Sequence, residues 1–175
     1  MKLKCSDFRD LSCWGDKKYD CVASTGNSLP HVNNADVMKA MEEMSKHVKD
    51  GGYLYLDMRN WDKIQREHNR FFLYNPVFLN GDRVNLIQVW DYNPDDTMTF
   101  NLLYTFERDN HIFQKEKFEE LYYPVKQELI LGKLKEMGYG NMEIMSFPAM
   151  DQQIEIDDMD WYCVVAQKQR EEDGE

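Results

Sequence analysis

The chain has 175 residues, of which 42% are hydrophobic and 13% aromatic, so it can form a domain with a sizeable core. Its formal net charge of −11 disfavours nucleic acid and anionic membranes as partners, because both are themselves negatively charged. No apolar run approaches the roughly 20 residues of a membrane span, and no secretory signal pattern opens the chain, so we expect a cytoplasmic protein.

The N-terminal residues carry little periodic pattern. Residues 3–5 suit at most the tail of a strand, and residues 6–11 predict a polar loop with one aromatic ring, Phe8. Taken alone, this segment is explained as well by a surface loop with Phe8 packed beneath it as by a binding loop. The four cysteines and four histidines are not spaced as metal ligands, so we expect reduced thiols and no metal site.

Residues 19–24 predict the first strand of a sheet. Tyr19, Val22 and Ala23 suit a buried strand in composition. The sequence Thr-Gly-Asn-Ser at residues 25–28 then ends the strand at its carboxyl end. Open α/β sheets bind their ligands at this edge, so the TGNS loop is a candidate binding element.

A helix and a second strand complete a βαβ unit. Asn33 predicts a helix N-cap, and the glycine pair at residues 51–52 is expected to end the helix. Residues 53–58 predict the next strand, which runs into Arg-Asn-Trp-Asp at residues 59–62. Because a right-handed crossover makes the two strands parallel, the TGNS and RNWD loops should emerge side by side. The apolar stripe of the helix consists of Val37, Met41, Met44 and Val48.

The pattern changes after about residue 65. Three alternating or strand-like segments joined by tight turns predict an antiparallel meander. We expect it to be an insertion over residues 65–123 that roofs the sheet edge bearing the two loops. The α/β part of this single domain then comprises residues 1–64 and 124–169. The predicted strands of the meander are residues 83–92, 98–106 and 112–123.

The remaining residues predict a helix and two strands. Pro124 suits the first turn of the helix, and Gly138 suits its end. The final strands are predicted at residues 141–147 and 161–167, and residues 170–175 are expected to be a solvated charged tail. The fold class is therefore α/β with an inserted antiparallel β meander. The apolar stripe of this helix consists of Leu129, Ile130, Leu134 and Met137.

The two loops and their strands resemble class I S-adenosylmethionine (SAM)-dependent methyltransferases. Residues 19–31 read YDCVASTGNSLPH, and residues 50–62 read DGGYLYLDMRNWD. Glycine and glycine/sarcosine N-methyltransferases carry a similar GNS loop followed by His and a similar Arg-Asn-Tyr-Asp run. The resemblance continues to the sequence Tyr-Tyr-Pro at residues 122–124 and the final strands. It implies a partial Rossmann-like sheet made of the family's later strands, with SAM as the cofactor and glycine or sarcosine as the methyl acceptor.

The same resemblance implies roles for individual residues. Gly26 and Asn27 match catalytic positions whose backbone carbonyls face the acceptor amine. Arg59 matches the arginine that binds the carboxylate of the amino acid. Asp7 and Phe8 match the loop that holds the adenine of the cofactor. Further contacts are implied for Trp61, Tyr104 and Tyr122 with the substrate and for His31 with the cofactor.

The chemistry of methyl transfer suits these residue types. Transfer from a sulfonium needs a neutral amine with its lone pair directed at the methyl group, and carbonyl acceptors can orient that amine. A guanidinium such as that of Arg59 binds a carboxylate through two parallel hydrogen bonds. Aromatic faces attract a sulfonium by roughly 0.5–2 kcal/mol. Singly, Asn27 is explained as a turn residue, His31 as a packing residue and the tyrosines as core residues.

A glycine-rich cofactor turn and the acidic residue that follows the family's second strand do not occur in the chain. The resemblance places the first residues at the end of the family's third strand. We therefore expect residues 19–24 to be an exposed sheet edge. We also expect the isolated chain not to turn over unless it is joined to a complementing N-terminal half, and a homo-oligomer is a second possible assembly. The alternatives are a methyltransferase for another small amine or acid, and a non-catalytic fragment or accessory subunit.

Overall fold

The chain divides into two compact units in a computed structural model that describes residues 2–148, 150 and 153–170. Met1–Arg66 and Val125–Glu175 form the first, which we call the α/β unit. Glu67–Pro124 forms the second, which we call the β unit. The sequence pattern predicted a single domain whose composition changes at residues 65 and 124, and this domain assignment stays a prediction. The expected roofing of one unit by the other stays a prediction.

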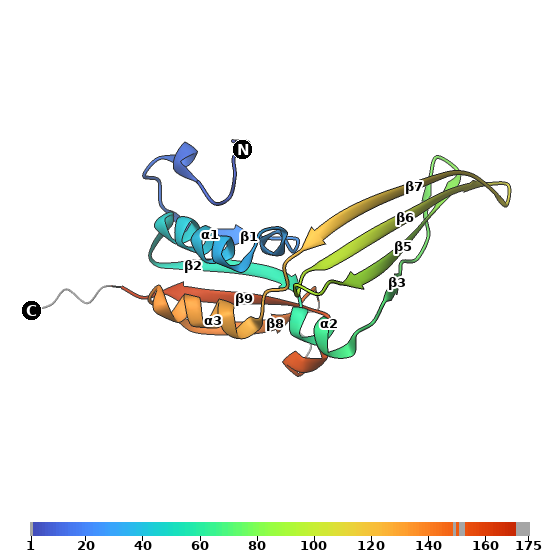
Figure 1. The fold of residues 1–175 in the computed structure, drawn as a ribbon. Helices are drawn as coiled ribbons and strands as arrows, with labels where there is room; N and C mark the ends of the chain where they lie inside the picture. The colour runs from blue at the N-terminus through green and yellow to red at the C-terminus, as the bar shows by residue number, and fades with distance from the viewer. Residues whose placement is uncertain (1, 149, 151–152, 171–175) are drawn as a thin grey trace, which may run out of the picture. The chain divides into compact units, whose positions relative to one another are not determined.

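The α/β unit is built on a mixed sheet with the strand order β1–β2–β9–β8 (Figure 1). The strands are β1 (Tyr19–Ser24), β2 (Val48–Arg59), β8 (Tyr139–Ser146) and β9 (Trp161–Lys168). β1 and β2 are parallel, as the βαβ pattern predicted, and the other neighbours are antiparallel. The carboxyl ends of β1 and β2 therefore lie next to each other, which brings the two predicted loops together.

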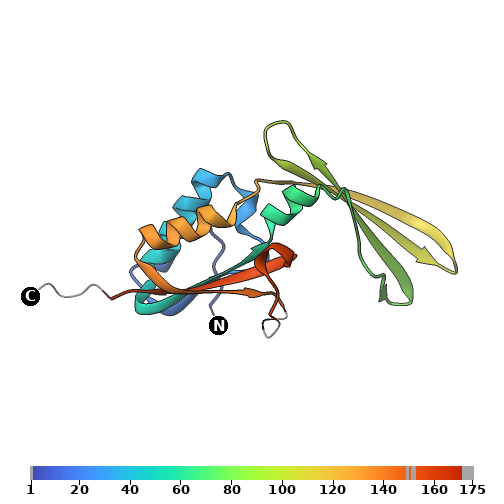
Figure 2. The same ribbon diagram turned by 90° about the horizontal axis from the view of Figure 1, so that it is seen from below.

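Helices α1 (Asn34–Lys46) and α3 (Gln127–Glu136) lie side by side on one face of this sheet (Figures 1 and 2). The Asn33 side chain caps α1 by accepting a hydrogen bond from the Asp36 amide at 3.0 Å, as predicted. Among the described residues, no helix is long and apolar enough to cross a membrane. The core between helices and sheet includes Val37, Met41, Met44, Leu54, Leu56, Met58, Ile130 and Leu134.

The first helix ends earlier than the glycine pair suggested. It stops at Lys46 with His47 as the C-cap, and Val48 already belongs to β2, where it pairs with Tyr19. Gly51 has a φ of +76° but lies inside β2, in a stretch where the register with β1 shifts. The prediction that these glycines close the helix is therefore wrong, because they form an irregularity of the strand.

Replacing Gly52 with alanine is expected to destabilise the α/β unit by about 1–3 kcal/mol. A Cβ here would lie 2.9 Å from the carbonyl oxygens of Asp20 and Lys49 and 3.1 Å from Val48 Cγ1, and backbone oxygens cannot rotate away. Gly132→Ala is the matched control in α3, where a Cβ meets nothing within 4 Å, and it should stabilise by about 0.5–1 kcal/mol. Urea denaturation measures both; equal stability of Gly52→Ala and wild type would contradict this packing.

Strand β1 is the outer strand of the sheet and, among the described residues, pairs with β2 alone. Tyr19 is 38% exposed, and Cys21 and Ala23 are also exposed. The prediction of a buried strand is therefore wrong, whereas the expected exposed edge is confirmed. Residues 3–5, predicted as the tail of a strand, have no regular structure, and Leu3 is largely exposed.

The last helix begins at Gln127, three residues after the predicted proline. The Gln127 amide donates a 2.8 Å hydrogen bond to the carboxylate of Asp62, which satisfies one of the otherwise unpaired groups of the first helical turn. Gly138 follows the helix with a φ of +80°, as expected for its C-terminal end. The predicted charged tail falls mainly on residues 171–175, which lie outside the described residues.

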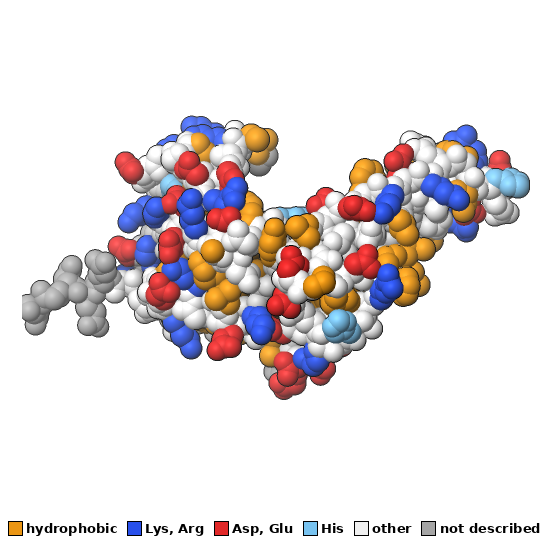
Figure 3. Space-filling model, viewed as in Figure 1, with side chains coloured by type: hydrophobic (Ala, Val, Ile, Leu, Met, Phe, Trp, Pro, Cys, Tyr) orange, Lys and Arg blue, Asp and Glu red, His pale blue; other side chains and the backbone are white. Residues whose placement is uncertain are grey.

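The β unit is an antiparallel sheet with the order β3–β5–β6–β7, in which β4 also pairs with β5. The predicted meander is confirmed in β5, β6 and β7, whereas the sequence pattern did not predict β3 and β4. Figure 3 shows hydrophobic side chains at its surface among charged ones, and Leu73 and Phe78 are 71% and 70% exposed. The strands are β3 (Phe71–Leu73), β4 (Val77–Leu79), β5 (Asp82–Tyr92), β6 (Met98–Arg108) and β7 (His111–Tyr122).

Candidate functional site

The TGNS loop leaves β1 through two consecutive residues in the left-handed region. Gly26 has a φ of +73° and Asn27 a φ of +60°. Glycine adopts this conformation freely, and asparagine does so more readily than most other residues. A Cβ at Gly26 would meet no atom within 4 Å, so this position borders open space. The sequence Gly-Asn therefore permits a tight reversal whose backbone is open to a ligand at Gly26.

The Asn27 side chain ties this loop to the end of β2. It is only 3% exposed, and its Oδ1 accepts hydrogen bonds from the Arg59 amide at 3.1 Å and from Trp61 Nε1 at 3.2 Å. Because both partners are donors, they fix which end of the amide is the oxygen. Asn27 Nδ2 is then a buried donor that has no hydrogen-bond partner among the described residues. The loop thus contains a rigid donor whose hydrogen-bonding capacity is unused.

Asp57 is a second contact between the loop and β2, and sequence reasoning missed it. Its Oδ1 accepts hydrogen bonds from the Gly26 amide at 2.8 Å and from Trp161 Nε1 at 3.2 Å. The Asn27 amide also points to the Asp57 carbonyl oxygen at 3.4 Å. The available signal was a carboxylate within an otherwise apolar run, YLYLDM, two residues before Arg59.

Arg59, the predicted carboxylate-binding residue, ends β2 beside the loop. It is half-buried, and its guanidinium carbon lies 5.3 Å from the ring centre of Trp161, a cation–π contact. Trp161 is also the residue directly opposite Arg59 in the β2–β9 ladder. The structure therefore places the predicted arginine next to Gly26 and Asn27, as the adjacent strand ends implied.

Trp61 has a different role from the predicted one. It begins α2 (Trp61–Glu67), is 1% exposed, and donates its indole N–H to Asn27. A ring this buried has almost no surface for a substrate, so it supports the loop from within. The sequence pattern had left these residues as a loop, and α2 turns the ring inward.

Asp7 and Phe8, the predicted adenine loop, lie in the irregular segment before β1. The Arg9 guanidinium donates to both oxygens of the Asp7 carboxylate, with contacts of 2.6 and 3.0 Å, and to Asp36 at 2.8 Å. These hydrogen bonds lower the pKa of Asp7 to about 2. Asp7 is therefore an ionised acceptor at neutral pH, with its orientation set by Arg9. Phe8 packs against the hydrophobic core.

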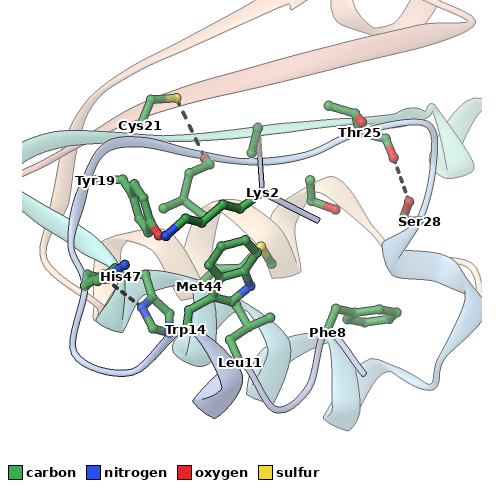
Figure 4. A pocket seen from close by; sticks show the side chains of 14 residues that line it. Lys2, Phe8, Leu11, Trp14, Tyr19, Cys21, Thr25, Ser28, Met44 and His47 are labelled. Atoms are coloured by element: carbon green, nitrogen blue, oxygen red, sulfur yellow. Dashed lines mark hydrogen bonds between the residues drawn. The ribbon is translucent and has the colours of Figure 1, made fainter. Parts of the chain in front are cut away.

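A pocket of about 820 Å³ joins this segment to the TGNS loop. Its walls come from the N-terminal segment, β1 and the end of α1. Figure 4 shows Phe8 at the same end of the pocket as Thr25 and Ser28, and Tyr19 and His47 at the other end. A pocket of this size is within the range of about 300–1,000 Å³ that small-molecule sites occupy. Between the two ends lie Leu11, Trp14 and Met44.

His31, a predicted cofactor contact, does not line this pocket. It ends the short 3-10 helix η2 (Leu29–His31), is exposed, and its amide bonds to the Ser28 carbonyl at 3.3 Å. The structure therefore places it near the loop in the chain, while its proposed contact with a cofactor stays a prediction.

Tyr104 and Tyr122 belong to the β unit and do not meet each other. Tyr122 pairs with Met98, which is six residues from Tyr104 along β6. At about 3.3 Å per residue, the two tyrosines are roughly 20 Å apart on one face of the sheet. Tyr122 packs on Phe100 at 4.5 Å and Tyr104 on Phe118 at 5.9 Å between ring centres. One small substrate could therefore contact only one of these tyrosines in the same copy, and the predicted substrate contacts of Tyr104 and Tyr122 stay predictions.

Replacing Arg9 with glutamine is expected to raise the pKa of Asp7 from about 2 towards its ordinary value near 3.9. Because the folded-state pKa is the lower one, the stabilisation by this pair is complete above about pH 4 and is lost as the pH falls towards 2. NMR titration of the Asp7 carboxyl carbon measures the change. Arg66→Gln, which removes a different arginine of the same unit, is the control and should leave the Asp7 pKa unchanged.

The chain is similar to methyltransferases in sequence and in fold. The chain matches no protein-family model. It is 27% identical over 164 residues to a glycine/sarcosine N-methyltransferase of Aphanothece halophytica, which covers 93% of this chain and 57% of that protein. The chain thus spans little more than half the length of this curated relative.

Solved structures agree on the fold. A SAM-dependent methyltransferase from Clostridium acetobutylicum superposes with a TM-score of 0.72 at 18% identity, over 97% of this chain and 65% of that one. A SAM-bound amino pentose methyltransferase from Micromonospora echinaspora gives 0.68 at 14% identity, over 93% and 63%. The chain has the α/β fold of SAM-dependent methyltransferases, and the resemblance that the GNS and RNWD motifs indicated is confirmed.

Proposed function

We propose that this chain provides the acceptor side of a SAM-dependent N-methyltransferase that acts on a small amino acid such as glycine or sarcosine. The observation that carries this proposal is the link between Gly26, Asn27 and Arg59. The Asn27 Oδ1 accepts from the Arg59 amide at 3.1 Å, so the backbone reversal and the main chain that carries the Arg59 guanidinium are held beside each other. One can hold an amine and the other a carboxylate, which are the two ends of an amino acid.

The Gly26–Asn27 reversal suits the amine. Backbone carbonyl oxygens accept N–H groups, and two of them can hold an amine so that its lone pair points away from the protein. The Asn27 reversal is held rigidly by Arg59 and Trp61. Catalysis of this kind works by orientation and needs no protein nucleophile.

Arg59 suits the carboxylate. Its guanidinium presents parallel donors that match the two oxygens of a carboxylate, and contact with Trp161 restrains it. The name of the Aphanothece halophytica relative, a glycine/sarcosine N-methyltransferase, supports an acceptor of this class.

The pocket beside β1 has features that fit SAM. Phe8 lines the pocket and offers an aromatic face. Asp7, the residue before it, does not line the pocket, but its ionised carboxylate retains acceptor capacity because it has about four lone-pair sites. Trp14 and Tyr19 add further aromatic surface to the pocket, away from the end at which Thr25 and Ser28 lie. SAM supplies the activated methyl group on its sulfonium sulfur. The two SAM-dependent structural neighbours support the same cofactor.

Ligand binding to the full chain tests the acceptor site without requiring turnover. We expect sarcosine to shift the NMR signals of the Gly26 and Asn27 amides and of the Arg59 side chain. Methylamine, which lacks a carboxylate, should bind more weakly, because it cannot use Arg59. Equal affinity for both amines would overturn the amino-acid assignment and favour another small amine as acceptor.

Cofactor binding is tested separately by calorimetry with SAM, followed by mass spectrometry of sarcosine after incubation with methyl-labelled SAM. Heat of binding that disappears in Phe8→Ala would support the pocket assignment. Failure to bind SAM, together with failure to bind sarcosine, would favour the alternative of a non-catalytic chain that needs a partner.

A further inference from the structure

Asp57 is a buried carboxylate near the end of β2. It is 4% exposed and points to the same face of the sheet as Arg59, two residues further along. A carboxylate loses the hydration of its charge when buried, and hydrogen-bond donors must replace that hydration. The donors identify what Asp57 holds in place.

One oxygen of Asp57 accepts from two different elements. The Gly26 amide, at the end of β1, donates at 2.8 Å, and Trp161 Nε1, at the start of β9, donates at 3.2 Å. The Trp161 ring in turn contacts the Arg59 guanidinium at 5.3 Å. The path from Gly26 to the guanidinium therefore runs through Asp57 Oδ1 and the Trp161 indole.

The Asn27 contact cannot replace this path. Asn27 Oδ1 binds the backbone amide of Arg59 and so fixes the main chain, whereas the guanidinium sits at the end of a flexible side chain. The Trp161 contact acts on the guanidinium itself. Trp161 is held by Asp57 and by its place opposite Arg59 in the ladder.

We propose that Asp57 is a positioning residue that sets the distance between the Gly26 backbone and the Arg59 guanidinium. This inference rests on the proposed function, in which these two groups hold the amine and the carboxylate of one acceptor. A fixed separation would favour an amino acid whose two ends match it, so Asp57 acts on selectivity for the acceptor. Its effect is indirect, through Gly26 and through Trp161.

The test compares Asp57→Asn with Asp62→Asn in the full chain by NMR. Asparagine keeps an oxygen acceptor but loses the charge, so hydrogen bonds to it are weaker. The Gly26 amide proton and the Trp161 indole proton should both move upfield in Asp57→Asn. Asp62→Asn should leave these two signals in place and shift the Gln127 amide, because Asp62 accepts from that group.

Ligand binding provides the readout that a purely structural role would not move. Asp57→Asn should lower the affinity for sarcosine by about 10-fold, which is the size expected when a hydrogen bond to a charged group is weakened. The affinity for methylamine, which has no carboxylate for Arg59 to bind, should fall much less. Asp57→Ala should lower the affinity for sarcosine further and again affect methylamine less. If the alanine variant does not fold, Asp57→Asn alone provides the test.

Unchanged Gly26 and Trp161 signals in Asp57→Asn would overturn the anchoring. Equal losses for sarcosine and methylamine would overturn the positioning of Arg59. If sarcosine fails to bind the unaltered chain, the proposed function fails, and the Gly26 and Trp161 signals alone then decide whether Asp57 anchors the loop to the tryptophan.

Discussion

Replacing Trp61 with alanine is expected to lower the free energy of unfolding of the α/β unit by about 3–5 kcal/mol. The ring is 1% exposed, so its removal leaves a large cavity at the start of α2. The change also removes the indole donor from Asn27 Oδ1, which then depends on the Arg59 amide. Urea denaturation followed by circular dichroism measures the loss.

Trp61→Phe separates the two causes. Phenylalanine fills much of the same space but has no N–H, so the loss of stability should be smaller than for alanine. The missing hydrogen bond to a buried oxygen accounts for about 1 kcal/mol of it. A loss below about 1 kcal/mol for Trp61→Ala would contradict the burial of the ring, and the predicted contact of Trp61 with the substrate would then be favoured again.

The βαβ unit was predictable because its signals are local. Asn33 caps its helix with its own side chain, and the buried residues Val37, Met41 and Met44 recur at the helical period. The rule that such a crossover joins parallel strands then places residues 25–28 beside residues 59–62 without any further information. This step alone predicted that Asn27 and Arg59 are neighbours.

The contacts that fix the site were not predictable in the same way. Gly26 bonds to Asp57 across 31 positions, and Trp161 bonds to Asp57 across 104 positions. The periodicity of apolar residues carries no information about such hydrogen bonds, because each joins two single residues that lie far apart in the sequence. From the sequence alone, Asp57 could be interpreted only as a polar residue near the end of a strand. Its contacts with Gly26 and Trp161 follow from the order of the strands in the sheet.

Two further errors have a common physical origin. Gly51 was read as a helix cap from its residue type, and Trp61 was read as a substrate contact from its place in the RNWD run. In the structure, Gly51 adopts its left-handed φ within an irregular part of β2, and α2 buries Trp61. A residue type restricts conformation or size, whereas neighbouring elements decide where that conformation is used.

The rigid part of the site is thus formed by hydrogen bonds among Gly26, Asn27, Asp57 and Trp61. Arg59 is the group that we propose binds a ligand. Removing Arg59 should consequently change binding much more than stability. Its side chain is half-buried, and its amide contact with Asn27 belongs to the backbone and survives substitution.

Replacing Arg59 with alanine is expected to weaken sarcosine binding by about 10- to 150-fold, because a hydrogen-bonded charged partner contributes about 1.5–3 kcal/mol. Arg59→Lys should give an intermediate loss, because an ammonium cannot form the two parallel hydrogen bonds of a guanidinium. Methylamine binding should hardly change in either variant. The matched control is Arg66→Ala, which removes an exposed arginine of α2 whose guanidinium bonds to the Asp157 carbonyl. NMR titration gives all of these affinities, and sarcosine bound equally well by Arg59→Ala and wild type would show that Arg59 does not hold the carboxylate.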